Sequence, residues 1–314
     1  MIHTEICDLL GIRYPVFQGG MAWIADGQLA AAVSEGGGLG IIAAGNAPAD
    51  YVRSQIRIAK DLTDKPIGLN IMLMSPFADD VAKVAVEEQV QVVTTGAGNP
   101  SKYIKDWKAA GIKVIPVVAS VAMAKLMTRL GADALIAEGG ESGGHVGELT
   151  TMVLVPQVCD ATSLPVLAAG GIADGRGMAA AFMLGAQGIQ MGTRFLSANE
   201  CTIHENYRKK ILNATDLCTM VTGKRLGHPV RSLRTQFARS YAKAEFSDTP
   251  DDVLEAMGTG ALRLAVQEGD NEKGCFLSGQ IAAMVKKQEP AADIIRNVVE
   301  SAEPILMGAA KWVK

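Results

Sequence analysis

Short apolar runs rich in Val and Ile recur along the first two thirds of the chain, and segments with apolar residues at three- and four-residue spacing separate them. The runs predict buried strands, and the spacing between them predicts amphipathic helices. The eight predicted strands are residues 14–20, 39–45, 66–72, 92–98, 113–118, 134–139, 165–172 and 188–195. The predicted helices include residues 27–35, 49–62, 77–88, 120–130 and 175–184.

Strict alternation of strand and helix predicts parallel pairing, and eight such units predict an α/β fold of the (β/α)8 TIM barrel type. Glycines that end helices directly before strands, at residues 36–38, 111, 131 and 185, fit the left-handed turn needed there. An open doubly wound sheet is the alternative fold. It is disfavoured because no G-x-G-x-x-G pattern follows the first predicted strand.

The pattern changes after Phe195, where helices are predicted without strands between them, at residues 206–214, 229–245, 251–267, 279–287 and 292–309. We interpret this part as a helical cap over the barrel. The predicted domains are residues 1–196 as the barrel, 197–273 as the cap and substrate lid, and 274–314 as a closing segment. The last helix is expected to pack back on the barrel or against a partner.

Composition narrows the function classes. A formal net charge of -3 argues against a protein that mainly binds nucleic acid, because such domains usually carry a basic excess. The N-terminus lacks the basic and apolar regions of a signal peptide, and no apolar stretch is long enough to span a bilayer. Five cysteines without a C-x-x-C pair suit a reducing compartment, so we expect a cytoplasmic enzyme.

Two glycine-rich strand ends predict a phosphate site. Gly170 and Gly171 lie at the end of the seventh predicted strand, and Gly192 and Thr193 lie at the end of the eighth. Residues without a side chain let a phosphate approach the backbone N–H groups, and a threonine hydroxyl adds a further donor. TIM barrels commonly bind phosphate at this pair of strand ends.

Other strand ends are polar or rich in glycine and predict hydrogen bonds to a planar ligand. Asn70 ends the third strand and Glu138 the sixth, and His145 follows on a glycine-rich loop. An imidazole there suits hydrogen-bond or proton donation to a substrate near neutral pH. The alternatives are a loop histidine bonded to backbone, a structural glutamate and a turn asparagine. His3, His204 and His228 show no metal-ligand spacing with cysteines or carboxylates, so we assign no metal.

Six segments together resemble the flavin-dependent enoyl-acyl-carrier-protein reductases of the FabK type. They are residues 15–23, 94–100, 137–139, 142–145, 169–175 and 190–195. Residues 45–48, 99–103 and 274–280 favour this reductase branch over the nitronate monooxygenases, which share the wider group. Cys275 and Leu277 depart from the branch, where Ser and Met are common, and this affects the expected fit of substrate or inhibitor.

The resemblance implies FMN as the cofactor, NADH or NADPH as the reductant, stimulation by a monovalent cation and a homodimer. It places the flavin near Met21, Ala22, Asn70 and Glu138, the ribityl chain near Gly143, and the phosphate on Gly171 and on residues 190–193. The complete set of cofactor-binding candidates is Gly20, Met21, Ala22, Asn70, Glu138, Gly143, Gly170, Gly171, Gln190, Met191, Gly192 and Thr193. His145 is the candidate catalytic residue.

The implied reaction is reduction of trans-2-enoyl thioesters in the last step of bacterial fatty-acid elongation. The alternatives are a nitronate monooxygenase, which oxidises alkyl nitronates with oxygen, and a flavin-binding sensor without turnover. The sequence leaves open the choice between NADH and NADPH, the acyl chain length, the cation and the oligomeric state.

A basic segment without acidic residues predicts a docking surface for the acidic acyl carrier protein. Its cations are Lys224, Arg225, Arg231, Arg234, Arg239 and Lys243. The alternative is a solvated basic helix face that binds nothing.

Overall fold

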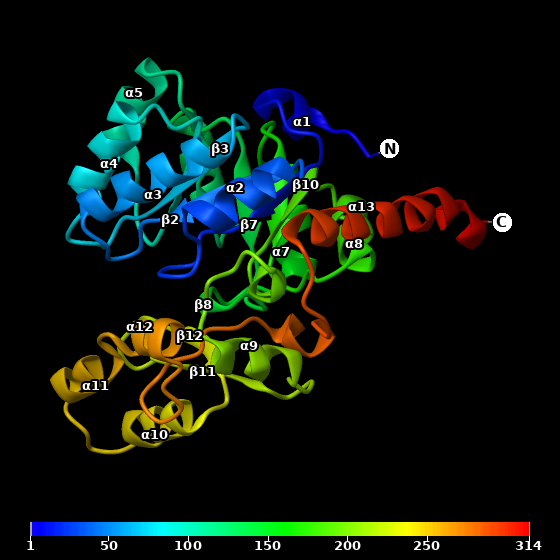
Figure 1. Cartoon of the computed structure of the whole chain (residues 1–314). Coiled ribbons are helices and arrows are strands. Elements are labelled where there is room, and N and C mark those ends of the chain that lie inside the picture. The colour runs from blue at the N-terminus through cyan, green and yellow to red at the C-terminus, as the bar shows by residue number, and fades with distance from the viewer. Residues whose placement is uncertain (1, 314) are drawn as a thin grey trace.

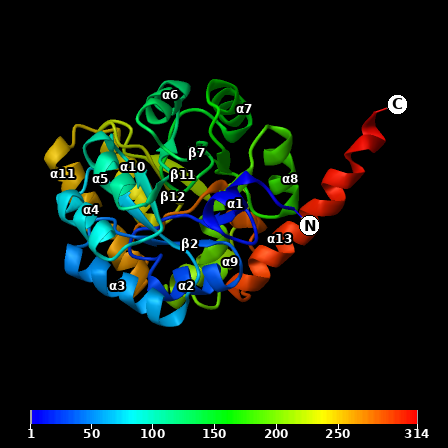
Figure 2. The ribbon, with the colours of Figure 1, turned by 90° about the horizontal axis from the view of Figure 1, so that it is seen from above.

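A parallel sheet curled into a barrel forms the centre of the fold, as Figures 1 and 2 show. The computed structural model describes residues 2–313. The strands are β1 (Val16–Gln18), β2 (Leu39–Ala43), β3 (Ile67–Met72), β4 (Val92–Gly96), β5 (Lys113–Val114), β6 (Val117–Val118), β7 (Leu135–Glu138), β9 (Val166–Ala169) and β10 (Gly188–Met191). Their order is β5-β4-β3-β2-β1-β10-β9-β7-β6, and all of these pairings are parallel.

The two edge strands of this sheet, β5 and β6, are the two halves of the predicted strand 113–118. Only Ile115 and Pro116 separate them, and proline has no N–H to continue the ladder. Ile115 N–H donates to the carbonyl of Val93 at 2.9 Å, while the carbonyl of Pro116 accepts from Ile136 N–H at 3.0 Å. The two ends of the sheet therefore meet, and the predicted TIM barrel is confirmed.

An outer ring of helices covers the strands, as the view from above in Figure 2 shows. The helices are α2 (Gly27–Glu35), α3 (Ala49–Leu62), α4 (Ala78–Glu87), α5 (Ser101–Ala109), α6 (Val121–Arg129), α7 (Thr151–Ala161) and α8 (Gly175–Met183). Apolar side chains between the strands and these helices make up two large buried clusters. Both faces of each strand are thus buried, as expected for parallel strands.

The barrel interior is a separate core. Side chains of Phe17, Ile41, Ile136 and Leu167 meet there, each from a different strand. The short helix α1 (Glu5–Leu10) contributes Ile6 to the same cluster. A solid, apolar barrel centre leaves the strand ends as the place for a ligand.

The cap consists of segments that follow β10 (Figure 1). They are η1 (Thr193–Ser197), α9 (Glu205–Leu212), β11 (Thr219–Thr222), β12 (Val230–Leu233), α10 (Gln236–Glu245), α11 (Asp251–Gly258), α12 (Ala261–Arg263), the π-helical turn η2 (Leu264–Glu268) and η3 (Gln280–Met284). The chain then returns to the barrel in α13 (Ala291–Met307) and η4 (Gly308–Trp312), and α13 packs against α8 and α2.

The prediction that the cap contains no strand is wrong. β11 and β12 are antiparallel, and β12 also pairs with β8 (Gly144–His145), which belongs to the loop after β7. The predicted helix 229–245 therefore begins as β12, and helix α10 starts only after Thr235, whose side chain accepts from Ala238 N–H.

Two further cap helices are shorter than predicted. Gly260, with φ of +75°, interrupts the predicted helix 251–267, because the left-handed conformation does not continue a right-handed helix. The predicted helix 279–287 is only the 3-10 turn η3. Among residues 2–313, none of the helices combines the length and apolar character that crossing a bilayer requires.

Candidate active site

A cavity of about 510 Å³ opens where the ends of the barrel strands meet the cap. The structure places the catalytic candidate and all the cofactor-binding candidates on its wall: Gly20, Met21, Ala22, Asn70, Glu138, Gly143, His145, Gly170, Gly171, Gln190, Met191, Gly192 and Thr193. They come from six different strand ends and loops, so the closed barrel is what brings them together.

The turn after β9 is shaped for an anion. Gly170 and Gly171 have φ of +89° and +73°, a conformation that residues with a side chain rarely adopt. A Cβ on Gly170 would also lie 2.7 Å from the carbonyl oxygen of Gly139. The sequence needs glycine here both for the turn and for the close packing of the next loop.

The neighbouring turn after β10 provides further donors. Gly279 N–H donates to Thr193 Oγ1 at 2.8 Å, which leaves the hydroxyl hydrogen of Thr193 for another acceptor. Among the residues that the structure describes, no hydrogen bond uses the backbone N–H of Gly171, Gly192 or Thr193. Backbone and hydroxyl donors without partners on one cavity wall suit a phosphate.

Glu138 lies at the end of β7 and faces the cavity. Its burial raises the pKa of the carboxyl to about 7. The nearby Ser142 hydroxyl lowers the pKa of Glu138 by a smaller amount. Within residues 2–313 the buried Oγ of Ser142 has no partner in good hydrogen-bonding geometry. This wall therefore carries a carboxyl and a hydroxyl that are available to a polar ligand.

Asn70 and Gln190 complete the polar floor. Asn70 Nδ2 donates to Thr94 Oγ1 at 3.0 Å, and a Cβ on Gly20 would lie 2.4 Å from the Asn70 Cβ. Gly20 thus lets the β1 loop lie directly on Asn70. The side-chain amide of Gln190 is largely buried and has no hydrogen bond to any residue within 2–313, so both its donor and its acceptor remain for a ligand.

His145 is held by a strand rather than by a flexible loop. It pairs with Val230 across β8 and β12, and Val146 N–H donates to the carbonyl of Pro229 at 3.0 Å. Partial burial, with a smaller effect from the nearby His228, lowers the pKa of His145 below its ordinary value. At neutral pH the imidazole is therefore mainly uncharged.

Several lining residues were missed by the sequence reasoning. Glu141 accepts Thr151 N–H at 2.9 Å and packs against Gly171, but nothing in its spacing distinguished it from a loop residue. His228 reaches the cavity because of the β11–β12 hairpin, which was not predicted. Gly279 also lines the cavity, and the glycine-rich run 274–280 was its only sequence signal. Leu277, which the resemblance singled out for substrate fit, lies on the cavity wall as well, whereas Cys275 is not among the lining residues.

The last question about the site is whether it could hold a metal ion. Within residues 2–313, no three His, Cys, Asp or Glu side chains gather in a way that could hold a metal ion.

Comparison with known proteins identifies the family. The family model for nitronate monooxygenase matches residues 3–301. A CoA dehydrogenase of Mycobacterium tuberculosis, the (3aS,4S,5R,7aS)-5-hydroxy-7a-methyl-1-oxo-octahydro-1H-indene-4-carboxyl-CoA dehydrogenase, is 34% identical, with 100% of this chain and 99% of that protein covered. A probable nitronate monooxygenase of Staphylococcus saprophyticus is 32% identical over 97% of this chain and 99% of its own.

Among solved structures, FabK from Thermotoga maritima is 50% identical, with a TM-score of 0.97 and complete coverage of both chains. The names of these relatives thus point to more than one activity. From the family match over nearly its whole length, the chain belongs to the nitronate monooxygenase family of oxidoreductases.

Proposed function

We propose that this protein is an FMN-dependent enoyl-acyl-carrier-protein reductase that uses NADH or NADPH. The observation that carries the proposal is the 50% identity to FabK from Thermotoga maritima over the full length of both chains. The curated relatives differ more from this chain, at 34% identity or less, and their names point to other substrates.

The cavity fits FMN by the chemistry of its donors. The unpartnered N–H groups of Gly171, Gly192 and Thr193 suit the phosphate, with Gly170 shaping the turn. The ribityl chain needs hydroxyl partners, and the cavity wall offers the side chain of Gln190 and the unpartnered Oγ of Ser142, which precedes Gly143. The remaining candidates for the flavin ring are Gly20, Met21, Ala22, Asn70, Glu138 and Met191.

The overall reaction is NAD(P)H plus a proton plus trans-2-enoyl thioester, giving NAD(P)⁺ and the saturated thioester. When bound, FMN supplies the relay of hydride between the two substrates. The protein has to exclude water, orient the thioester and stabilise the negative charge that develops on its oxygen.

His145 is proposed to stabilise that charge. Because its pKa is lowered, the imidazole is neutral at pH 7 and offers one ring N–H as a hydrogen-bond donor to the thioester oxygen. Its pairing with Val230 fixes the backbone of the donor. A donor whose position is already fixed does not have to reorient when negative charge develops on the thioester oxygen, so it lowers the barrier at little cost.

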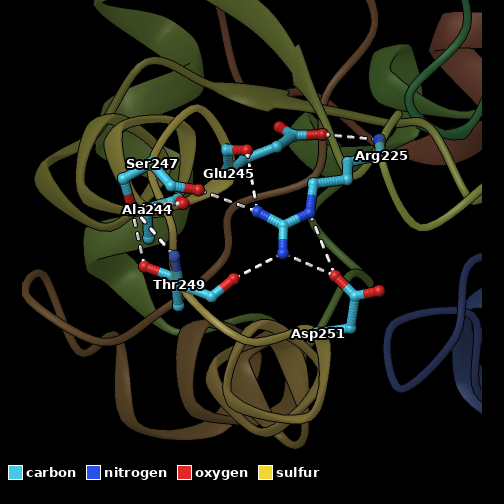
Figure 3. A network of polar contacts seen from close by, with 6 residues as sticks. All are labelled: Arg225, Ala244, Glu245, Ser247, Thr249 and Asp251. Atoms are coloured by element: carbon cyan, nitrogen blue, oxygen red, sulfur yellow. Dashed lines mark hydrogen bonds and ion pairs between the residues drawn. The ribbon is translucent and has the colours of Figure 1, made fainter.

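The acyl carrier protein is proposed to dock on the basic cap surface, but the contributions of its residues differ. Arg225 is held by Asp251 and by the carbonyls of residues 245, 247 and 249, as Figure 3 shows. Arg231 is half-buried and donates to the carbonyl of Gly140 at 2.9 Å. The exposed cations left for docking are Lys224, Arg234, Arg239 and Lys243.

This docking proposal agrees with the location of the cavity mouth. The β11–β12 loop carries Lys224, and four residues later His228 lines the cavity. A carrier bound at Lys224 would deliver its thioester arm to the same opening. The homodimer and the activating monovalent cation, implied by the family resemblance, remain part of the proposal. So does the cytoplasmic location, which was inferred from the cysteines and the N-terminal sequence.

The test separates the two half-reactions under nitrogen. Purified protein loaded with FMN should be bleached by NADH or NADPH and reoxidised by crotonyl thioester, and His145→Ala should slow only the second step, by about 10²- to 10⁴-fold. Oxygen uptake with an alkyl nitronate and no nicotinamide would instead assign a nitronate monooxygenase. The proposal would be overturned if NADH and NADPH failed to bleach the bound flavin and crotonyl thioester failed to reoxidise reduced flavin.

A further inference from the structure

The two sides of the cavity differ in chemistry. The ionisable side chains on its wall come from the end of β7, from the loop after it and from the β11–β12 hairpin; they are Glu138, Glu141, His145 and His228. The side formed by β3, β4, β6 and the start of α6 has no ionisable lining residue. Its members are Met72, Met74, Gly96, Ala97, Gly98, Val117, Ala119 and Met123.

These residues form one continuous wall, called the methionine wall below. β3 pairs with β4, and β4 packs against β6. Leu73 N–H donates to the carbonyl of Gly96 at 3.0 Å, which ties the loop after β3 to the end of β4. The wall is therefore held by backbone contacts, while its side chains face the cavity.

Part of the apolar surface of this wall is left uncovered by the protein, although Met123 and Val117 also pack on the buried clusters. Met74 is 57% exposed, although a methionine of this size usually buries most of its surface. Met72 and Met123 are partly exposed and also line the cavity. Methionine side chains are flexible and polarizable, so such a surface adapts to apolar ligands of different length.

The backbone of the wall also indicates a site. Ala97 adopts φ of +53°, a conformation that is costly for a residue with a side chain. At Gly96, whose φ lies outside the left-handed range, an added Cβ would meet no protein atom within 4 Å. A side chain there would extend into the cavity rather than into packed protein.

We propose that the methionine wall binds the acyl tail of the substrate, a linear apolar chain of variable length. This inference rests on the proposed function. The competing occupant, the nicotinamide nucleotide, carries a diphosphate, and the wall offers it no cation. The polar side with His145 is then left for the thioester end, so an amphipathic substrate has one orientation in the cavity.

The experiment compares chain-length profiles. We measure kcat/KM for crotonyl, octenoyl and dodecenoyl thioesters with the FMN-loaded wild type, Gly96→Val and Met74→Gln. Dissociation constants of the saturated dodecanoyl thioester provide a readout without turnover. Gly308→Val is the matched control, because Gly308 is also open to a Cβ and lies outside the cavity lining, at the end of α13.

We expect both wall variants to lose about ten-fold or more in kcat/KM and in affinity for the long chains, while crotonyl turnover stays within about two-fold. The control should keep the wild-type profile. An unchanged profile in both wall variants, or an equal loss at every chain length, would overturn the acyl-tail site. If the wild type reduces none of the three thioesters although it binds flavin, the proposed function itself fails.

Discussion

The backbone N–H of Gly279 donates a 2.8 Å hydrogen bond to Oγ1 of Thr193, which joins the closing segment of the cap to the turn after β10. Close by, Gln280 N–H donates to the carbonyl of Glu141 at 2.9 Å. A Cβ on Gly143 would lie 2.6 Å from the carbonyl carbon of Ser278, so the loop after β7 and the closing segment are in close contact. Three segments distant in sequence thus meet at the proposed phosphate site.

Thr193→Val should weaken FMN binding, because it removes both the acceptor for Gly279 N–H and the hydroxyl donor to the phosphate. A hydrogen bond to a charged group contributes about 1.5–3 kcal/mol, so the dissociation constant should rise by roughly ten- to a hundred-fold. Fluorescence titration of the apoprotein with FMN measures this. Thr193→Ser keeps the hydroxyl and should bind like the wild type; equal weakening in both variants would contradict the role of the hydroxyl.

Gly171→Ala should lose both stability and FMN affinity, because φ at this residue is +73°. A left-handed conformation costs a residue with a side chain about 1–2 kcal/mol. Gly111→Ala is the matched control, since Gly111 has φ of +78°, no neighbour within 4 Å of an added Cβ, and a position after α5 away from the cavity. Urea unfolding should show similar losses in both variants, whereas FMN titration should change only in Gly171→Ala.

The barrel was predictable from the sequence because its signals are local. Each strand is an apolar run of its own, and glycines such as Gly131 and Gly185 mark the helix ends before the next strand. The β8–β12 pairing gave no such signal, because β8 has only two residues, Gly144 and His145. Its partner β12 pairs mainly with the nearby β11, but its four residues are too short a run to be distinguished from the start of the predicted helix 229–245.

The same distinction applies to the candidate site. Gly170, Gly171 and Thr193 lie at the ends of predicted strands, so strand order alone places them together. His228 reaches the cavity only through the hairpin, and Glu141 gains its position from the N-terminus of α7, where it accepts Thr151 N–H. Residues of this kind need the tertiary structure before they can be found.

Glu138→Gln should stabilise the apoprotein increasingly as pH rises. Burial raises the pKa of Glu138 to about 7, whereas the unfolded chain has the ordinary value of about 4.3. Between these values the folded state holds more protons, so the wild type loses stability as pH increases from about 4 to about 7. Melting temperatures at pH 5 and pH 8 test this. The melting temperature of the variant minus that of the wild type should be larger at pH 8 than at pH 5. A melting-temperature difference that is the same at both pH values would contradict the prediction.

Arg225→Ala should loosen the cap. The guanidinium donates to Asp251 Oδ1 at 2.6 Å and to the carbonyl of Ser247 at 3.0 Å, so it connects the β11–β12 loop to the turn between α10 and α11 (Figure 3). We expect a loss of about 1–3 kcal/mol and faster proteolysis near residues 245–251. Lys224→Ala, at the neighbouring exposed position, should leave both the unfolding curve and the cleavage pattern as in the wild type.

Charge reversal on α10 tests the docking surface. Arg239 and Lys243 are exposed and lie four residues apart, so they project from one face of the helix. The double variant Arg239→Glu with Lys243→Glu should raise KM for carrier-bound enoyl substrate by about five-fold at low salt, because an acidic partner loses two favourable charges. The effect should shrink at high salt, where such interactions are screened.

The control for this variant is Lys105→Glu with Lys125→Glu, which changes the net charge equally on the exposed faces of α5 and α6. It should leave KM for carrier-bound substrate unchanged. Enoyl-CoA carries the same thioester without the carrier protein, so neither double variant should alter its KM by more than about two-fold. Equal increases for both substrates would mean that the charges act on the thioester arm or on the fold, and α10 would then lose its role as the carrier surface.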